Sequence, residues 1–301
     1  MLNRLPMRLP PEVYDFVRTL FEDCNAHVAR KIAHMPTSHE TSLDMSLIEA
    51  ISQHAPASHR VAPDWIVRLE THYLGGGRHF GQWEVADIGF IVVWRDRGKV
   101  KLRKVAILQS KRLYPDEQGL EEDTPLDYMI GFGRLMQGDE EDLAAQEERV
   151  FTFTHESRYR ALVSGDDQYQ AIEAYEARRA IPVHYLFYNP LSIPWAQRVP
   201  VTERKRFPRN DVGVQVIRAR ALQLALRRRQ GGYTPTYADV AGLNPWRLEV
   251  FVADELLRCR QGYRAKGPND DGLVQVFSRR TGPISTAIGI TIDRVSPGGT
   301  S

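Results

Sequence analysis

Apolar residues recur every three or four positions near the start of the chain, which is the spacing of one helix face. The pattern predicts a helix over residues 11–34 and a second over residues 41–54, with a break at Pro36. Residues 64–74 instead alternate between apolar and polar side chains, and a period of two is typical of a half-buried strand. We therefore expect two helices followed by a strand.

Two more strands are predicted directly afterwards. Residues 85–94 are apolar on both faces, as in a central strand, and residues 100–111 form a third strand-like run. Short turns between these segments favour an antiparallel meander. Further on, a helix over 168–180 precedes an apolar strand over 182–188, and such a crossover places the strand parallel to a neighbour.

The other segments are expected to lie around this core. Residues from about 114 to 150 are polar and acidic, and we expect an insertion of loops and short helices there. After Pro190, the pattern predicts a basic helix over 214–229 and an amphipathic helix over 246–260. A hairpin made of residues 273–279 and 287–292 is expected to close the chain.

The predicted fold class is α/β. Its core is a helix, an antiparallel three-strand meander, a helix and a strand in one mixed sheet. We expect an N-terminal helical segment (1–37), this core (38–190) and a basic α+β C-terminal region (191–301) packed on it.

Composition and charge narrow the class of protein. No stretch has the roughly 18 consecutive apolar residues that span a bilayer, and the first residues lack a signal-like apolar segment, so a cytoplasmic location is expected. Two cysteines, Cys24 and Cys259, exclude a multi-cysteine zinc site. The formal net charge is only +2, yet residues 198–229 hold nine arginines and one lysine against two acidic residues. Such a local excess can attract a polyanion.

Three polar side chains interrupt the predicted strands. Asp87 lies within the second strand, and Gln109 and Lys111 lie at the end of the third. With the turn centred near Arg97, Asp87 is expected opposite Ile107 and diagonal to Gln109. All three then share a face, provided that the turn has an odd number of residues, because a one-residue slip would reverse Asp87.

These residue types suit a magnesium site that hydrolyses phosphodiesters. Magnesium prefers oxygen ligands and is often held by one or two carboxylates plus substrate. Asp87 can supply an anionic oxygen and Gln109 a neutral carbonyl oxygen. Lys111 can orient the attacking water and offset negative charge in the transition state.

The arrangement Asp87 … Gln109-Ser110-Lys111 resembles the PD-(D/E)xK nuclease superfamily, with glutamine at the second acidic position and no proline before Asp87. The resemblance covers roughly residues 38–190 and implies Mg²⁺, which Mn²⁺ can replace. It also implies a glutamate from the preceding helix. Glu40 is the first choice because it shares a face with Asp44, whereas Glu49 falls on the opposite face.

Five further residues belong to the predicted site and its surroundings. Glu70, on the first strand, is the rival to Glu40 as a further ligand. Gln168, at the start of the later helix, is expected to support the site or touch phosphate. The concentrated arginines Arg227, Arg228 and Arg229 are expected to contact nucleic acid, although a solvated helix face explains them too.

The resemblance implies a metal-dependent endonuclease acting on double-stranded DNA, in restriction or anti-phage defence. Two alternatives stay open: a nucleic-acid-binding or complex-assembly subunit with a degenerate site, and an RNA nuclease. Because an unrestrained nuclease is toxic, a regulatory protein partner or a homo-oligomer is also expected.

Overall fold

A computed structural model of the chain describes residues 8–55, 57–74, 85–118, 149–199, 206–229, 231–267, 269–277 and 283–296. Residues 75–84 and most of the predicted insertion at about 114–150 lie outside these residues. Both cysteines are free thiols. In the described part of the chain, no helix has both the length and the apolar character needed to cross a membrane.

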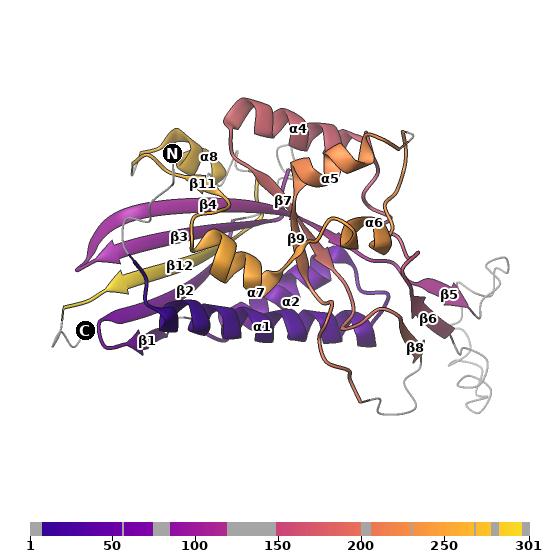
Figure 1. Cartoon of the computed structure of the whole chain (residues 1–301), viewed down its shortest axis with the longest axis horizontal. Coiled ribbons are helices and arrows are strands. Elements are labelled where there is room, and N and C mark those ends of the chain that lie inside the picture. Colours follow the sequence, from indigo (N-terminus) through magenta and orange to yellow (C-terminus); the bar gives the residue numbers. More distant parts are fainter. Residues whose placement is uncertain are drawn as a thin grey trace, which may run out of the picture.

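A large mixed sheet forms the centre of the molecule (Figure 1). Its strands within the described residues are β1 Ser58–Ala62, β2 Trp65–Tyr73, β3 Ile88–Asp96, β4 Lys99–Arg112, β7 Val183–Tyr188, β9 Gln215–Arg218, β10 Trp246–Arg247, β11 Tyr263–Arg264 and β12 Thr286–Arg294. Their order is β1-β2-β12-β3-β4-β7-β9-β10, with β11 paired to β4. The pairs β12–β3 and β4–β7 are parallel and the others antiparallel, so the molecule is a mixed α/β protein.

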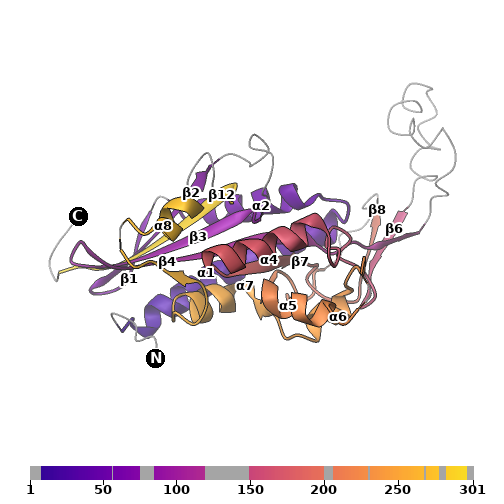
Figure 2. The ribbon, with the colours of Figure 1, turned by 90° about the horizontal axis from the view of Figure 1, so that it is seen from above.

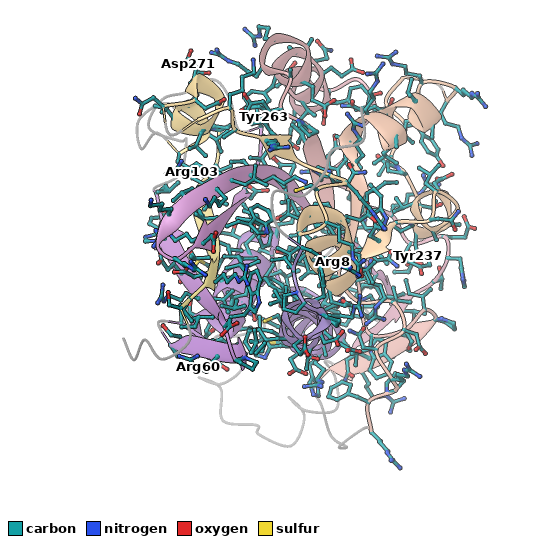
Figure 3. All side chains as sticks on the ribbon, turned by 60° about the vertical axis from the view of Figure 1, so that its left-hand side comes forward. Arg8, Arg60, Arg103, Tyr237, Tyr263 and Asp271 are labelled. Atoms are coloured by element: carbon teal, nitrogen blue, oxygen red, sulfur yellow. The ribbon has the colours of Figure 1, made fainter. Side chains whose placement is uncertain are left out.

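Helices cover both faces of this sheet. Helices α1 (Pro11–His34) and α2 (Glu40–Ser52) lie on one side, where Phe21 packs 5.8 Å from Phe90 of β3, measured between ring centroids. Helices α4 (Asp167–Arg179) and α5 (Ala219–Leu226) lie side by side on the other (Figures 1 and 2). Side chains fill the space between these layers (Figure 3).

Shorter elements complete the fold. They are α6 Tyr237–Ala241, α7 Leu248–Val250, the π-helical turn η3 Phe251–Leu256, and α8 Asp271–Val276. A separate three-stranded sheet consists of β5 Asp116–Gln118, β6 Arg149–Phe153 and β8 Trp195–Val199. Because β5 pairs with β6, the two ends of the predicted insertion lie side by side.

Several predicted elements are confirmed. Both N-terminal helices, the strand at 65–73 and the helix at 167–179 lie where the hydrophobic pattern places them. The strand after that helix, β7, pairs parallel to β4 as the crossover rule predicts, with Gln109 beside Tyr185.

The predicted meander is wrong, because β2 and β3 are not neighbours. Strand β12 lies between them, antiparallel to β2 and parallel to β3. Most of its side chains are buried, and Ile288, Ile290 and Ile292 are fully so, which suits a central strand. Strands that are consecutive in sequence usually pair, but here a strand from the C-terminal end of the chain lies between β2 and β3.

The predicted C-terminal elements also need correction. Residues 271–276 form helix α8, which the Asp270 carboxylate caps by accepting a bond from Leu273 N, so the closing hairpin is wrong. The predicted basic helix at 214–229 begins as strand β9, whose Val216 and Ile217 are buried against β7. The amphipathic helix at 246–260 is divided into β10, α7 and η3.

Candidate active site

Asp87 and Gln109 face one another directly. Ile88 is the last residue of β3 paired with β4, opposite Leu108, and just before it the Asp87 amide donates to Leu108 O at 2.9 Å. Gln109 Nε2 then donates to Asp87 Oδ2 at 2.5 Å. The expected partner opposite Asp87, Ile107, is therefore wrong by two residues, and the shift brings the two polar side chains closer than the diagonal predicted.

A β-bulge, and not a turn with an odd number of residues, brings Asp87 and Gln109 to the same face of the sheet. The turn has two residues, Arg97 and Gly98, with φ angles of 51° and 77°, the positive values that a tight hairpin turn requires. Arg95 pairs with Val100 but Trp94 pairs with Leu102, so Lys101 is an extra residue in β4. The predicted odd turn is thus wrong, and the bulge supplies the missing residue.

Helix α2 adds the half-buried carboxyl group of Asp44, which sequence reasoning did not assign to the site. Asp44 Oδ1 accepts from Ser110 Oγ at 2.5 Å and from Tyr188 Oη at 2.6 Å. The Ser110 amide donates to Asp87 Oδ2 at 2.7 Å, so this one residue binds two carboxylates. The sequence did contain a signal for this contact, since Asp44 lies one helical turn after Glu40 on the same helix face.

Glu40 lies at the same end of β4. Its Oε1 accepts from the Arg112 amide at 3.1 Å, and its Oε2 is 3.8 Å from Lys111 Nζ. The Arg112 guanidinium also donates to the carbonyls of Pro36 and Ser38, just before α2 begins. Since the N-cap residue His39 gives α2 no side-chain cap, Arg112 fixes the entry of the helix and with it the position of Glu40.

The backbone of Asp87 is held from the C-terminal end of the chain. Ser285 donates to Asp87 O through its amide at 3.1 Å and through its Oγ at 2.8 Å, and the Thr286 amide donates at 3.0 Å. The insertion of β12 beside β3 therefore positions Asp87. No local sequence signal could have shown this contact, because the residues are almost 200 positions apart.

Negative charges interact within the cluster. Burial, together with the charges of Asp87 and Glu40, raises the pKa of Asp44 to about 8, against the lowering effect of its two hydrogen bonds. Burial and the neighbouring Asp44 raise the pKa of Tyr188. Lys111, only 3% exposed, supplies a positive charge beside Glu40. A cation bound near Asp87 and Glu40 would be favoured by the negative charges of these two carboxylates.

The amide oxygen of Gln109 fits such a cation. Gln109 is 3% exposed, and its Oε1 is buried with no hydrogen-bond partner in the described residues. A buried carbonyl without a partner is unfavourable unless something binds it. Among the described residues, no group of three or more His, Cys, Asp or Glu side chains is arranged to hold a metal ion, so any ion here needs this amide oxygen or water as a ligand.

Glu70 is not brought to the cluster. It pairs with Gly289 of β12, which in turn pairs with Ile91 of β3. Ile91 lies four residues beyond Asp87, roughly 13 Å along the strand. The Glu70 side chain is 58% exposed and lies 3.3 Å from His72 Nε2. The inserted strand thus separates Glu70 from the other predicted ligands.

The predicted nucleic-acid contacts lie on the α4–α5 side. Arg227 is ion-paired to Glu173 at 2.7 Å and Arg229 to Asp239 at 3.1 Å, while Arg228 is exposed. Gln168 lies in the first turn of α4, after the Asp166 cap. Since α4 leads into β7, its first turn lies at the end of the sheet where β4 carries Lys111 (Figure 2).

Comparisons with protein-family models, with curated proteins and with solved structures each returned no match for this chain. Function must therefore be inferred from the geometry of the site.

Proposed function

We propose that the protein is a magnesium-dependent nuclease of the PD-(D/E)xK type that hydrolyses phosphodiester bonds in double-stranded DNA. The observation that carries the proposal is the meeting of Asp87, Gln109 and Lys111 with Glu40 at one end of two paired strands. The buried, partnerless Gln109 oxygen supports it, because it gives the glutamine a reason to lie there.

The donor set fits magnesium. Asp87 and Gln109 would hold the ion, with Glu40 or Asp44 as a further carboxylate, and all of these ligands are oxygens. When bound, the ion would neutralise a phosphate oxygen and lower the pKa of the attacking water. Gln109 now presents its amide nitrogen to Asp87. A cation between the two side chains would favour the amide oxygen in its place.

The chain's own residues position the reacting groups. Lys111 offers a buried ammonium that would bind a phosphate oxygen and the water, and Glu40 holds that ammonium in place. Ser110 ties Asp44 and Asp87 together on both sides of β4. The resemblance to PD-(D/E)xK enzymes, in which stand-alone nucleases of restriction and anti-phage defence are common, supports a role in such defence.

A plasmid-nicking assay tests the proposal. We expect wild type to nick supercoiled DNA with Mg²⁺ or Mn²⁺, and both Asp87→Asn and Lys111→Ala to lose at least about a hundredfold in rate. Lys101→Ala is the matched control, since it removes an exposed lysine from the same strand. Gln109→Glu should retain cleavage and bind Mn²⁺ more tightly, because it adds a charged ligand. Wild type as inactive as Lys111→Ala with both metals would reject the proposal.

One observation favours a second candidate, a nucleic-acid-binding or assembly subunit with a degenerate site. Asp87 Oδ2 already accepts bonds from the Gln109 amide and the Ser110 amide, and this closed arrangement is stable without a metal. Calorimetric titration with Mn²⁺ distinguishes the nuclease from the binding subunit. A heat of binding that disappears in Asp87→Asn supports the nuclease, and DNA binding without metal binding supports the subunit. RNA in the same nicking assay tests the RNA-nuclease alternative.

A further inference from the structure

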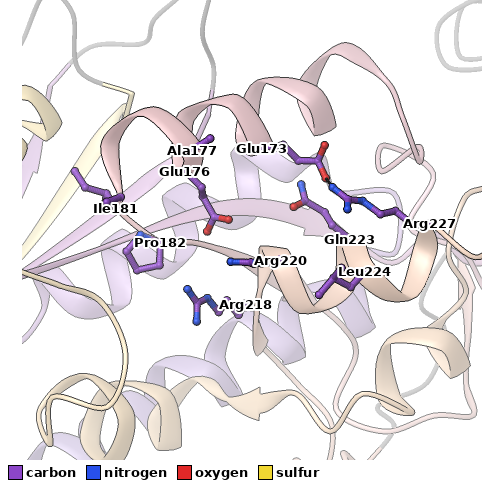
Figure 4. A pocket seen from close by; sticks show the side chains of 11 residues that line it. Glu173, Glu176, Ala177, Ile181, Pro182, Arg218, Arg220, Gln223, Leu224 and Arg227 are labelled. Carbon is purple, nitrogen blue, oxygen red and sulfur yellow. Dashed lines mark hydrogen bonds and ion pairs between the residues drawn. The ribbon is translucent and has the colours of Figure 1, made fainter. Parts of the chain in front are cut away.

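A cavity of about 520 Å³ lies between α4 and α5, away from the carboxylate cluster (Figure 4). Its lower wall carries Arg218, at the end of β9, and Arg220, in the first turn of α5. Its upper wall carries Glu173 and Glu176 of α4. A volume of this size matches that of pockets for small organic ligands.

The two acidic residues are already bound within the protein. Glu173 is ion-paired to Arg227 at 2.7 Å, and Glu176 Oε1 accepts from the Val183 amide at 2.8 Å. By contrast, neither the Arg218 side chain nor the Arg220 side chain makes a hydrogen bond or an ion pair with a described residue. Both guanidinium charges lower the pKa of Glu176, against the larger effect of burial, which raises it. In Figure 4 the Arg220 side chain extends beneath Glu176, and the Arg218 side chain lies below Pro182. The cavity therefore has two cationic groups available for a ligand.

The cavity also has an apolar part. Pro182 and Leu224 are its larger side chains that reach the surface. In addition, α5 begins at Ala219, so the positive end of its dipole lies beside the two arginines. An anion with an attached organic group would use both the charge and the apolar wall.

We propose that this cavity binds a phosphate ester, with the phosphate held between Arg218 and Arg220 and its organic part against Pro182 and Leu224. Guanidinium groups bind phosphate through paired, charge-assisted hydrogen bonds. Glu173 and Glu176 line the opposite wall, and their charge disfavours a long polyanion in the same space. The geometry thus favours one phosphate group of a small molecule of nucleotide size. This proposal does not depend on hydrolysis at the carboxylate cluster.

Calorimetric titration of the full chain with inorganic phosphate and with adenosine monophosphate tests the proposal. We expect wild type to bind the nucleotide, and Arg218→Gln/Arg220→Gln to bind it at least about tenfold more weakly. The matched control is Arg60→Gln/Arg209→Gln, which removes two exposed arginines; Arg60 lies on β1 at the far edge of the sheet (Figure 3). The control should bind as wild type does.

Competition between the nucleotide and a DNA duplex identifies the source of the phosphate. If a 12-base-pair duplex fails to displace the nucleotide, the ligand is a free phosphate ester. If the duplex displaces it from wild type, the cavity takes a backbone phosphate of DNA. The proposal is overturned if neither phosphate nor nucleotide binds wild type, or if the double variant binds as tightly as the control. Nicking by Arg218→Gln/Arg220→Gln should remain when nucleotide binding is lost, which separates this outcome from failure of the nuclease proposal.

Discussion

At the residue scale, the side chains of Gln109 and Asp44 differ in how their polar oxygen atoms are bonded. Gln109 donates its Nε2 to Asp87 and leaves its Oε1 without a hydrogen-bond partner among the described residues. Asp44 instead has two donors, Ser110 and Tyr188, yet burial still raises its pKa. The first arrangement suits a ligand site and the second suits a group that holds its neighbours in place. The residue types alone predicted the first but not the second.

His184 gives a prediction about pH. It is fully buried on β7, against the Phe251 ring at 4.9 Å, and burial lowers its pKa to about 4. The unfolded chain binds this proton more readily, so the contribution of neutral His184 to stability is fully present above pH 6.5. It is lost as the pH falls toward 4.

Between pH 6.5 and 4, the unfolding free energy of His184→Phe should fall by about 3 kcal/mol less than that of wild type, because phenylalanine cannot be protonated. Urea denaturation at a series of pH values measures this slope. His72→Gln is the control, since the His72 side chain is 59% exposed. An unchanged slope in His184→Phe would show that the buried ring is not responsible.

At the element scale, the hairpin of β3 and β4 determines whether a site exists. Its two-residue turn alone would place Asp87 opposite Leu108, on the wrong face, and the bulge at Lys101 corrects the phase. Sequence periodicity predicted both strands well. It could not predict the bulge, because an extra residue near a turn leaves the alternation of the longer strand almost unchanged.

Deletion of Lys101 tests this role. The shortened strand can pair Val100 with Arg95 and Leu102 with Trp94 without a bulge, so Gln109 should still face Asp87. We expect nicking within about tenfold of wild type and little change in melting temperature.

Deletion of Arg103 is the matched control. It moves Lys101 into the pairing position of buried Leu102, which should cost roughly 2 kcal/mol of unfolding free energy. Loss of nicking in the Lys101 deletion, with its circular dichroism unchanged, would mean that the bulge does more than set the register.

At the scale of the whole molecule, the C-terminal strand joins the two parts of the chain. Local patterning predicted most helices and strands, as well as the parallel β7, because those depend on near neighbours. The position of β12 could not be predicted, because its pairing partners β2 and β3 lie about 200 residues earlier. A six-residue apolar run fits a hairpin as well as a central strand. Its effect extends to the site, since Ser285 holds Asp87.

This topology predicts that the C-terminal strand stabilises the entire sheet. Ile290 is fully buried between Leu69 and Val92, so Ile290→Asn should lower the unfolding free energy by about 4 kcal/mol. Tryptophan fluorescence and circular dichroism should give the same unfolding transition, because Trp65 lies on β2 and Trp94 on β3, the two strands that pair with β12. Val274→Asn, at a 56% exposed position on α8, should change stability by less than about 0.5 kcal/mol. If Ile290→Asn produced an early transition confined to one probe, the C-terminal third would unfold separately, and β12 could not be the element that holds Asp87 in the folded protein.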